Sequence, residues 1–256
     1  MSVPHTLIDH PLLTLDALGD LADHLPEDRV ERLRGDAPEI VANGGSQASE
    51  LSPGEVARTI EANGLWMVLK NIEQHPDYKR LLDETLDEVA PLVDDHEGGM
   101  TLREGFVFLS SPNSTTPSHT DPEHNFLMQV RGTKQMTVGR FPDEDTRQLE
   151  IEDHVSGGHR NIDWLPVEPK VFEMEPGDAV YVPPHAPHMV KNGPTASVSF
   201  SITFRTPELE RIQRVSSINA RMRRLGLSPK PPGLRPRTDR VKASTSKALG
   251  RVRRMV

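Results

Sequence analysis

Short apolar runs, each bounded by turn residues, dominate the chain between residues 105 and 204. Their length and their content of β-branched and aromatic residues indicate strands rather than helices. The predicted strands are 105–111, 125–130, 135–141, 170–174, 179–183 and 197–204. Several short strands at this spacing are typical of a sandwich or barrel, and not of a parallel α/β sheet.

The region before these strands carries helical signals. The tetrapeptide Ser52–Glu55 reads Ser-Pro-Gly-Glu, which is a capping box with Pro53 at the first helical position. We expect this helix to stop near Asn63-Gly64, because glycine commonly follows the last turn of a helix. The apolar run 65–71 then predicts a buried strand.

Two further segments, 77–93 and 207–225, carry apolar residues at helical spacing, and the second begins after Thr206-Pro207. The apolar positions are Leu82, Leu86, Val89 and Val93 in the first segment, and Ile212, Val215, Ile218 and Met222 in the second. The second stripe predicts a packing face. It could contact the N-terminal helices, cover the strands, or pair with a second copy to give a homodimer.

These patterns predict a mainly β fold with helical additions at both ends. The expected parts are an N-terminal helical region at 1–98 that packs on the strands, a strand-rich core at 99–206, a C-terminal helix at 207–228, and a basic, partly disordered tail at 229–256.

Charge is distributed unevenly along the chain, whose net charge is -8 over 256 residues. From residue 221 onward there are twelve Lys or Arg and one acid, Asp239, whereas residues 1–220 carry 18 basic and 37 acidic side chains. A basic tail can neutralise the phosphates of a nucleic acid, but an acidic body repels them. The composition therefore favours a solvated tail and argues against nucleic acid as a partner.

Composition also narrows the compartment and the available metal ligands. Apolar residues make up 35% of the chain, and no run approaches the length of about 18 residues that a membrane span needs. The N-terminal residues do not resemble a secretion signal, so we expect a cytoplasmic protein with no membrane association. Cysteine is absent, which leaves His, Asp and Glu as the strong metal ligands.

Two His-x-Asp triplets occur, at His75–Asp77 and at His119–Asp121. The first lies where the helix over 77–93 begins, and an acid in the first turn of a helix is explained by the helix dipole. The second lies in a turn between two predicted strands, as a ligand pair at the rim of a barrel would. A histidine bonded to a backbone carbonyl and an Asx-turn aspartate would explain the same residues without a metal.

A second motif favours the metal. Residues Gly177–Asn192 fit the pattern G-x5-P-x-G-x2-H-x3-N of the second cupin motif, with His188 at the histidine position and His185 in place of the glycine. The chain here resembles the cupin, or double-stranded β-helix, superfamily. His188 is the expected ligand by its position in the motif, and His185 is the alternative.

His119, Asp121 and His188 together form the 2-His-1-carboxylate set that leaves coordination positions open on non-haem Fe(II). Because the first motif reads H-x-D and not H-x-H, the chain resembles the Fe(II)- and 2-oxoglutarate-dependent dioxygenases more than ordinary cupins. Within them, residues 105–205 resemble the jumonji-C branch, especially the asparaginyl hydroxylases of hypoxia-inducible factor. The matching residues are Thr116, Pro117, His119, Asp121, Asn125, Phe126, Gln129, Gly132 and Lys134, with Tyr181, Pro183 and His188 further on.

The resemblance implies a double-stranded β-helix (cupin or jelly-roll) barrel flanked by N- and C-terminal helices. It also implies an oxygenase that uses Fe(II), 2-oxoglutarate and O2, hydroxylates a substrate, and releases succinate and CO2. Few aromatic residues are present, so the substrate, whether a protein side chain or a small molecule, stays unidentified. An alternative is a cupin-type metalloprotein that acts as a small-molecule dioxygenase, an isomerase or a ligand-binding regulator without 2-oxoglutarate. A third is a non-enzymatic interaction protein that works through its basic tail.

The same resemblance assigns Lys134 as the cation that binds the distal carboxylate of 2-oxoglutarate, with the hydroxyl of Thr116 beside it. The remaining residues expected in the cosubstrate pocket are Asn125, Ser201 and Thr203. Arg205 competes with Lys134, because the polar face of the strand over 197–204 continues to it and arginine binds carboxylates in a bidentate manner. A solvated turn residue would be the ordinary explanation of Lys134.

Overall fold

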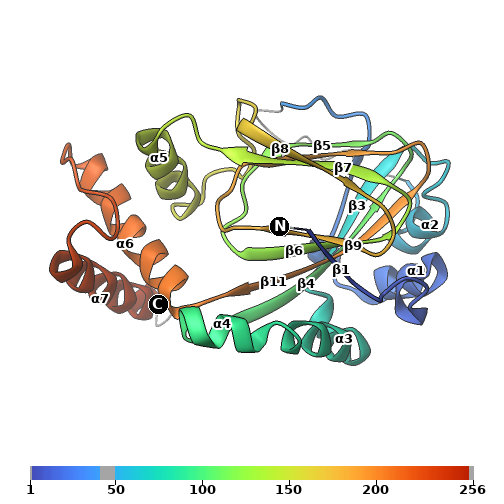
Figure 1. Cartoon of the computed structure of the whole chain (residues 1–256), viewed down its shortest axis with the longest axis horizontal. Helices are drawn as coiled ribbons and strands as arrows, with labels where there is room; N and C mark the ends of the chain where they lie inside the picture. Colours follow the sequence, from blue (N-terminus) through green and yellow to red (C-terminus); the bar gives the residue numbers. More distant parts are fainter. Residues whose placement is uncertain (1, 41–49, 254–256) are drawn as a thin grey trace.

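Two antiparallel β-sheets face each other in the computed structural model, which describes residues 2–40 and 50–253 (Figure 1). The larger sheet has the order β1 (Ser2–Pro4), β9 (Asp178–Val182), β6 (His124–Arg131), β11 (Ser197–Arg205), β4 (Thr101–Ser110), β3 (Leu65–Lys70) and β2 (Val30–Arg34). The smaller has the order β5 (Thr115–His119), β10 (His188–Asn192), β7 (Lys134–Arg140) and β8 (Val167–Met174). The predicted mainly β fold is confirmed, and each of the strands predicted between 105 and 204 is present.

Helices lie outside the sheets. They are α1 (Leu15–His24), α2 (Pro53–Arg58), α3 (Pro76–Asp87), α4 (Ala90–Glu97), α5 (Glu144–His154), α6 (Pro207–Arg224) and α7 (Pro236–Arg253), with short 3-10 turns η1 (Pro11–Leu13), η2 (Glu27–Arg29) and η3 (Ile72–Gln74). In Figure 1, α3 and α4 lie along the outer side of the larger sheet, while α5, α6 and α7 gather at one end of the molecule. The strands therefore form the middle of the fold.

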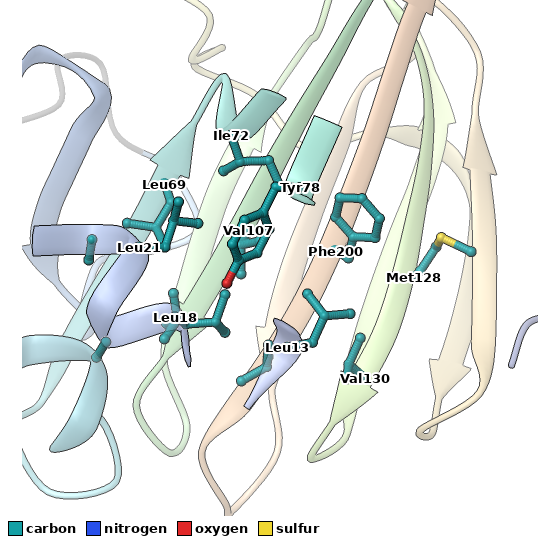
Figure 2. Close-up of a cluster of buried hydrophobic side chains, with 14 of the residues drawn as sticks. Leu13, Leu18, Leu21, Leu69, Ile72, Tyr78, Val107, Met128, Val130 and Phe200 are labelled. Carbon is teal, nitrogen blue, oxygen red and sulfur yellow. The ribbon is translucent and has the colours of Figure 1, made fainter. Parts of the chain in front are cut away.

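Two apolar clusters stabilise this arrangement. The larger cluster joins the outer face of the larger sheet to α1 and α3, where Leu18, Tyr78 and Phe200 are buried (Figure 2). The smaller cluster lies between the sheets and consists of Leu127, Met136, Met174, Val180, Val182 and Val190. Alternation along β11 explains the split, because its apolar face packs outward on the helices while its hydroxyl face turns inward.

Proline shapes the N-terminal helices. The capping box is present, since Ser52 Oγ accepts from the backbone N–H of Glu55 and the Glu55 carboxylate accepts from the N–H of Ser52. The helix predicted over 77–93, however, divides into α3 and α4. Pro91 lacks an N–H and fits only the first turn of a new helix, so a single continuous helix was the wrong prediction.

The C-terminal region differs from the expected partly disordered tail, because Pro236–Arg253 form α7, which packs on α6. The Asp239 carboxylate accepts from the N–H of Gly233 at 2.8 Å, and the ammonium of Lys242 donates to Asn219 Oδ1 at 2.5 Å. Composition alone predicted a solvated segment, but these buried polar contacts hold it as a helix. Residues 254–256 of the tail lie outside the described part of the chain.

The predicted stripe on α6 packs within the chain. Val215 is fully buried, the other three stripe residues are partly buried, and α6 contacts α5 as well as α7. The helices that α6 contacts are therefore α5 and α7 rather than the expected N-terminal helices. A homodimer through α6 stays a prediction.

A buried glutamine fixes the turn between β6 and β7. Gln129 Nε2 donates to the carbonyls of Arg131 and Gly132 at 2.6 and 3.0 Å, and its Oε1 accepts from Ser199 Oγ at 2.8 Å. Gly132 has φ +69°, and a Cβ there would lie 2.4 Å from the carbonyl oxygen of Ala196. The turn that leads into Lys134 is thus specified by a side chain and by a glycine.

We expect Gln129→Leu to lower the free energy of unfolding by about 2 to 4 kcal/mol, because it removes several hydrogen bonds and leaves buried carbonyls unpaired. Urea unfolding followed by circular dichroism measures this. Gln135→Leu is the matched control, since Gln135 bonds to Glu173 on the exposed side of the smaller sheet and its loss should cost far less. Equal stability of the Gln129 variant and the wild type would contradict the structural role.

Candidate metal centre

Antiparallel pairing of β5 with β10 brings two histidines together. His119 ends β5, His188 begins β10, and the register places them directly opposite each other. Their ring centroids are 4.0 Å apart. Asp121 lies two residues beyond His119, and its Oδ2 is 3.9 Å from His119 Nε2 and 3.6 Å from His188 Nε2. One nitrogen or oxygen atom from each of the three residues falls within 4.8 Å of the others.

The backbone sets the orientation of both imidazoles. His119 Nδ1 lies 2.7 Å from the carbonyl oxygen of Pro117, and His188 Nδ1 lies 2.9 Å from that of Ala186. A carbonyl only accepts, so each Nδ1 carries the proton and donates it there. Each Nε2 is therefore left with its lone pair directed toward Asp121. Such outer hydrogen bonds orient histidine ligands in metal sites generally.

Charge and burial give these groups the protonation state that a metal requires. Burial, with a contribution from His188, lowers the pKa of His119 to about 4, so this imidazole is neutral at pH 7. Burial alone would raise the pKa of Asp121, but the charge of Arg160, whose guanidinium donates to this carboxylate, holds it well below its usual range. A neutral imidazole and an ionised carboxylate are ready to bind a cation without releasing protons.

Arg160 and His185 hold Asp121 from two sides. Arg160 Nη1 donates to Asp121 Oδ1 at 2.9 Å, which leaves Oδ2 facing the histidines. The N–H of His185 donates to the Asp121 carbonyl at 2.6 Å. The His185 ring packs edge-on against His154 with centroids 6.0 Å apart. Of the two candidate histidines, the structure thus brings His188 to the centre and turns His185 toward α5.

A narrow cavity of about 40 Å³ extends from the three residues between the sheets. Its apolar wall consists of Trp66, Phe108, Leu127, Met136 and Val190, and its polar wall of Ser110, Thr116, Asn125 and Lys134 together with the triad. Three of the residues predicted for a cosubstrate pocket, Thr116, Asn125 and Lys134, therefore line the same cavity as the triad. An apolar cavity with a few polar groups is the usual form of a small-molecule site.

Lys134 is the unusual member of this wall. Its side chain is 4% exposed, and burial lowers its pKa to about 7. No carboxylate of the described residues forms an ion pair with it. A buried ammonium without a counter-charge is costly, so an anionic ligand of the cavity would relieve that cost.

The remaining predicted residues lie elsewhere. Ser201 donates to Asn125 Oδ1 at 2.8 Å, and Thr203 donates to the carbonyl of Glu104 at 3.2 Å. Arg205 pairs with Glu123 at 2.6 Å and borders a separate cavity beside α6. Ser201 can therefore act on the cavity through Asn125, while Arg205 is turned toward the helices.

Two features of the site have no counterpart in the sequence patterns. Trp66 lies on a strand that was predicted, but which face of β3 borders the cavity depends on its pairing with β4. Arg160 comes from a loop about forty residues after Asp121, and the residues around it carry no periodicity. No local sequence signal could have identified either residue.

Comparisons with known proteins agree with this geometry. Residues 93–212 match the family model of the JmjC domain. The Jumonji C domain-containing protein 5 of Drosophila melanogaster is 29% identical over 106 residues, which are 37% of this chain and 26% of that protein. This chain thus matches about a quarter of the length of the fly relative.

Solved structures show the same fold. The ribosomal oxygenase YcfD of Escherichia coli, in complex with cobalt and 2-oxoglutarate, superposes with a TM-score of 0.53 at 17% identity, over 97% of this chain and 62% of that one. A second structure of YcfD gives a TM-score of 0.51 at 18% identity, over 97% and 63% of the two chains. At this level of identity, the likeness concerns the fold.

The paired sheets, the convergent His119, Asp121 and His188, and the matched residues lead to one conclusion. Residues 93–212 of this chain are similar to the JmjC domain, and this stretch holds all three of the convergent residues.

Proposed function

We propose that this protein is an Fe(II)- and 2-oxoglutarate-dependent oxygenase that hydroxylates a substrate and releases succinate and CO2. The observation that carries the proposal is one cavity with a metal-binding triad and an unpaired buried cation on its walls. A 2-oxo dicarboxylate has a chelating end and a second carboxylate, and so needs a partner for each. The described residues supply both.

The residues present fit the metal. His119, Asp121 and His188 would hold Fe(II) through two neutral nitrogens and one carboxylate oxygen, a set that suits non-haem iron and leaves positions for other ligands. When bound, the iron would supply the oxidation chemistry that couples decarboxylation of 2-oxoglutarate to oxidation of a C–H bond. The protein's part is to orient the ligands, which the carbonyls of Pro117 and Ala186 and the Arg160 guanidinium do here.

Lys134 would bind the distal carboxylate, with the Thr116 hydroxyl on the same wall of the cavity. Asn125, held by Ser201, adds a polar group there. The competing cation, Arg205, already has Glu123 as its partner and lies against a different cavity. These contacts favour Lys134 as the anchor.

The primary substrate is not identified by these residues, and both a protein side chain and a small molecule fit the proposal. A cupin-type metalloprotein that does not use 2-oxoglutarate is the second candidate, since the triad alone would serve it equally well. Lys134 favours the oxygenase, because a buried ammonium has no role in a site that binds only a metal and a neutral ligand. In the described residues no helix is long and apolar enough to span a bilayer.

Fe(II)-dependent release of succinate from 2-oxoglutarate tests the activity. We expect the wild type to release succinate and His119→Ala and His188→Ala to release none, because each removes one of three ligands. His185→Ala is the matched control in the same motif and should remain active. Turnover in His119→Ala equal to that of the wild type would rule out the triad. No turnover, and no thermal stabilisation by 2-oxoglutarate with Fe(II), would favour the second candidate.

Calorimetry of 2-oxoglutarate binding separates the two possible anchors. A charge-assisted hydrogen bond of about 1.5 to 3 kcal/mol predicts that Lys134→Met weakens 2-oxoglutarate about 10- to 150-fold. Arg205→Met should change the affinity little, because its partner is Glu123. Metal binding, followed separately in each variant, should stay intact. The assignment fails if Lys134→Met binds 2-oxoglutarate as tightly as the wild type does.

The pH dependence of the same binding follows from the pKa of Lys134, which burial lowers to about 7. Below pH 7 the free protein already carries the ammonium, so affinity should be constant. Above pH 7 binding must be accompanied by proton uptake, and the dissociation constant should rise by up to about tenfold per pH unit. Lys134→Arg keeps its charge and should bind with no such dependence. A flat wild-type profile between pH 6.5 and about 8.5 would show that Lys134 stays charged over this range, and so would contradict the lowered pKa.

A further inference from the structure

From Arg221 onward, all exposed charge on the described part of the C-terminal hairpin is positive. The hairpin consists of α6, α7 and the connector between them, and its exposed basic residues from 221 onward are Arg224, Lys230, Arg235, Arg237, Arg240 and Lys247. The only acid in this stretch, Asp239, is 1% exposed, and its carboxylate bonds inward to Gly233. The fold therefore removes the single negative side chain from this surface and leaves the cations on it.

These six cations have no carboxylate partners, unlike those of the rest of the chain. Before residue 221, nearly every arginine and lysine forms an ion pair with Asp or Glu. The exceptions are Lys134, inside the cavity, and Lys170, which lies over the Phe172 ring. Within the described hairpin from residue 221, Arg223 forms an ion pair, with Glu152, and the exposed six form none. Their charge is available to a partner.

The cations of α7 share one side of the helix. Asp239 and Lys242 are buried toward α6, whereas Arg237, Arg240 and Lys247, at spacings of three and seven, lie on the opposite side. By helical spacing, the exposed Ser244 lies on this side as well, and the exposed Thr238 and Thr245 lie on the flank of the helix. Because buried contacts fix α7 against α6, this row is presented on a defined surface rather than on a tail.

A row of cations and hydroxyl groups suits phosphate oxygens better than it suits a lipid surface. Arg, Lys, Ser and Thr supply most contacts to nucleic-acid backbones. A membrane-bound helix needs a broad apolar face, but the large apolar residues exposed on α7 are Val241 and Leu249 alone among those described. The acidic body opposes binding only weakly here, because charges further away than about 8 to 10 Å are screened at physiological salt.

We propose that the outer face of α7 binds the phosphate backbone of a nucleic acid. Figure 1 places this helix at the end of the molecule, away from α1 and α2. The net charge of the whole chain argued against a nucleic acid as a partner. In the fold, however, the basic residues that have no carboxylate partner lie together on one face. The site is separate from the metal centre, so it does not depend on the proposed oxygenase activity.

Fluorescence anisotropy with a labelled 20-nucleotide single-stranded RNA of mixed sequence tests the site on the full chain. We expect Arg237→Glu/Arg240→Glu/Lys247→Glu to weaken binding about tenfold or more at low salt. The slope of log Kd against log salt should fall by about 2, which corresponds to the loss of about three phosphate contacts. All three residues are exposed, so circular dichroism should show an unchanged fold.

The matched control is Arg34→Glu/Arg80→Glu/Arg140→Glu, which makes the same change of net charge at exposed positions of the body. It should retain wild-type affinity. The proposal is overturned if the wild type does not bind RNA, if both triple variants weaken it equally, or if the wild type binds vesicles of phosphatidylserine and phosphatidylcholine but not RNA. The vesicle measurement also tests whether the exposed apolar residues of the connector bind a membrane. These residues are Leu225, Leu227 and Leu234.

Discussion

The pairing of β5 with β10 is the interaction on which the site depends. Because side chains alternate between the faces of a strand, a slip of one residue would turn His119 or His188 to the other face. The register that places them opposite each other is interrupted just beyond His188, where the pairing shifts before Val190. Both rings are then oriented by backbone carbonyls two residues earlier in the chain. The metal ligands are thus set almost entirely by backbone geometry.

The space between the sheets is divided between apolar and polar groups. Leu127, Met136 and Val190 contribute both to the inner cluster and to the cavity wall, so the packing that joins the sheets also shapes the cavity. Lys134 lies in this wall because β7 begins directly after a turn fixed by Gln129 and Gly132. The buried Gln129 therefore determines the position of Lys134, although Gln129 does not contact the triad.

Much of this arrangement could be predicted from the sequence, because it is encoded locally. Short apolar runs bounded by turn residues identified the strands, and His119, Asp121 and His188 belong to short motifs with fixed spacing. What could not be predicted depends on contacts between distant segments. Arg160 reaches Asp121 from another loop, and α7 is held by contacts with Asn219 and Gly233 that its composition does not reveal. The sequence showed that the C-terminal end is basic and the rest of the chain acidic. It did not show that the basic residues lie together on one face of the fold.

The isolated charge of Lys134 has a consequence for the lifetime of the protein. A buried ammonium without a counter-charge lowers the stability of the folded chain, and an anion that binds beside it returns that stability by mass action. Small changes in stability alter how much of a protein escapes cellular proteases. If the anion proposed above fills the cavity, the stability of the folded protein would rise with the concentration of that anion, and the amount of protein that persists would rise with it.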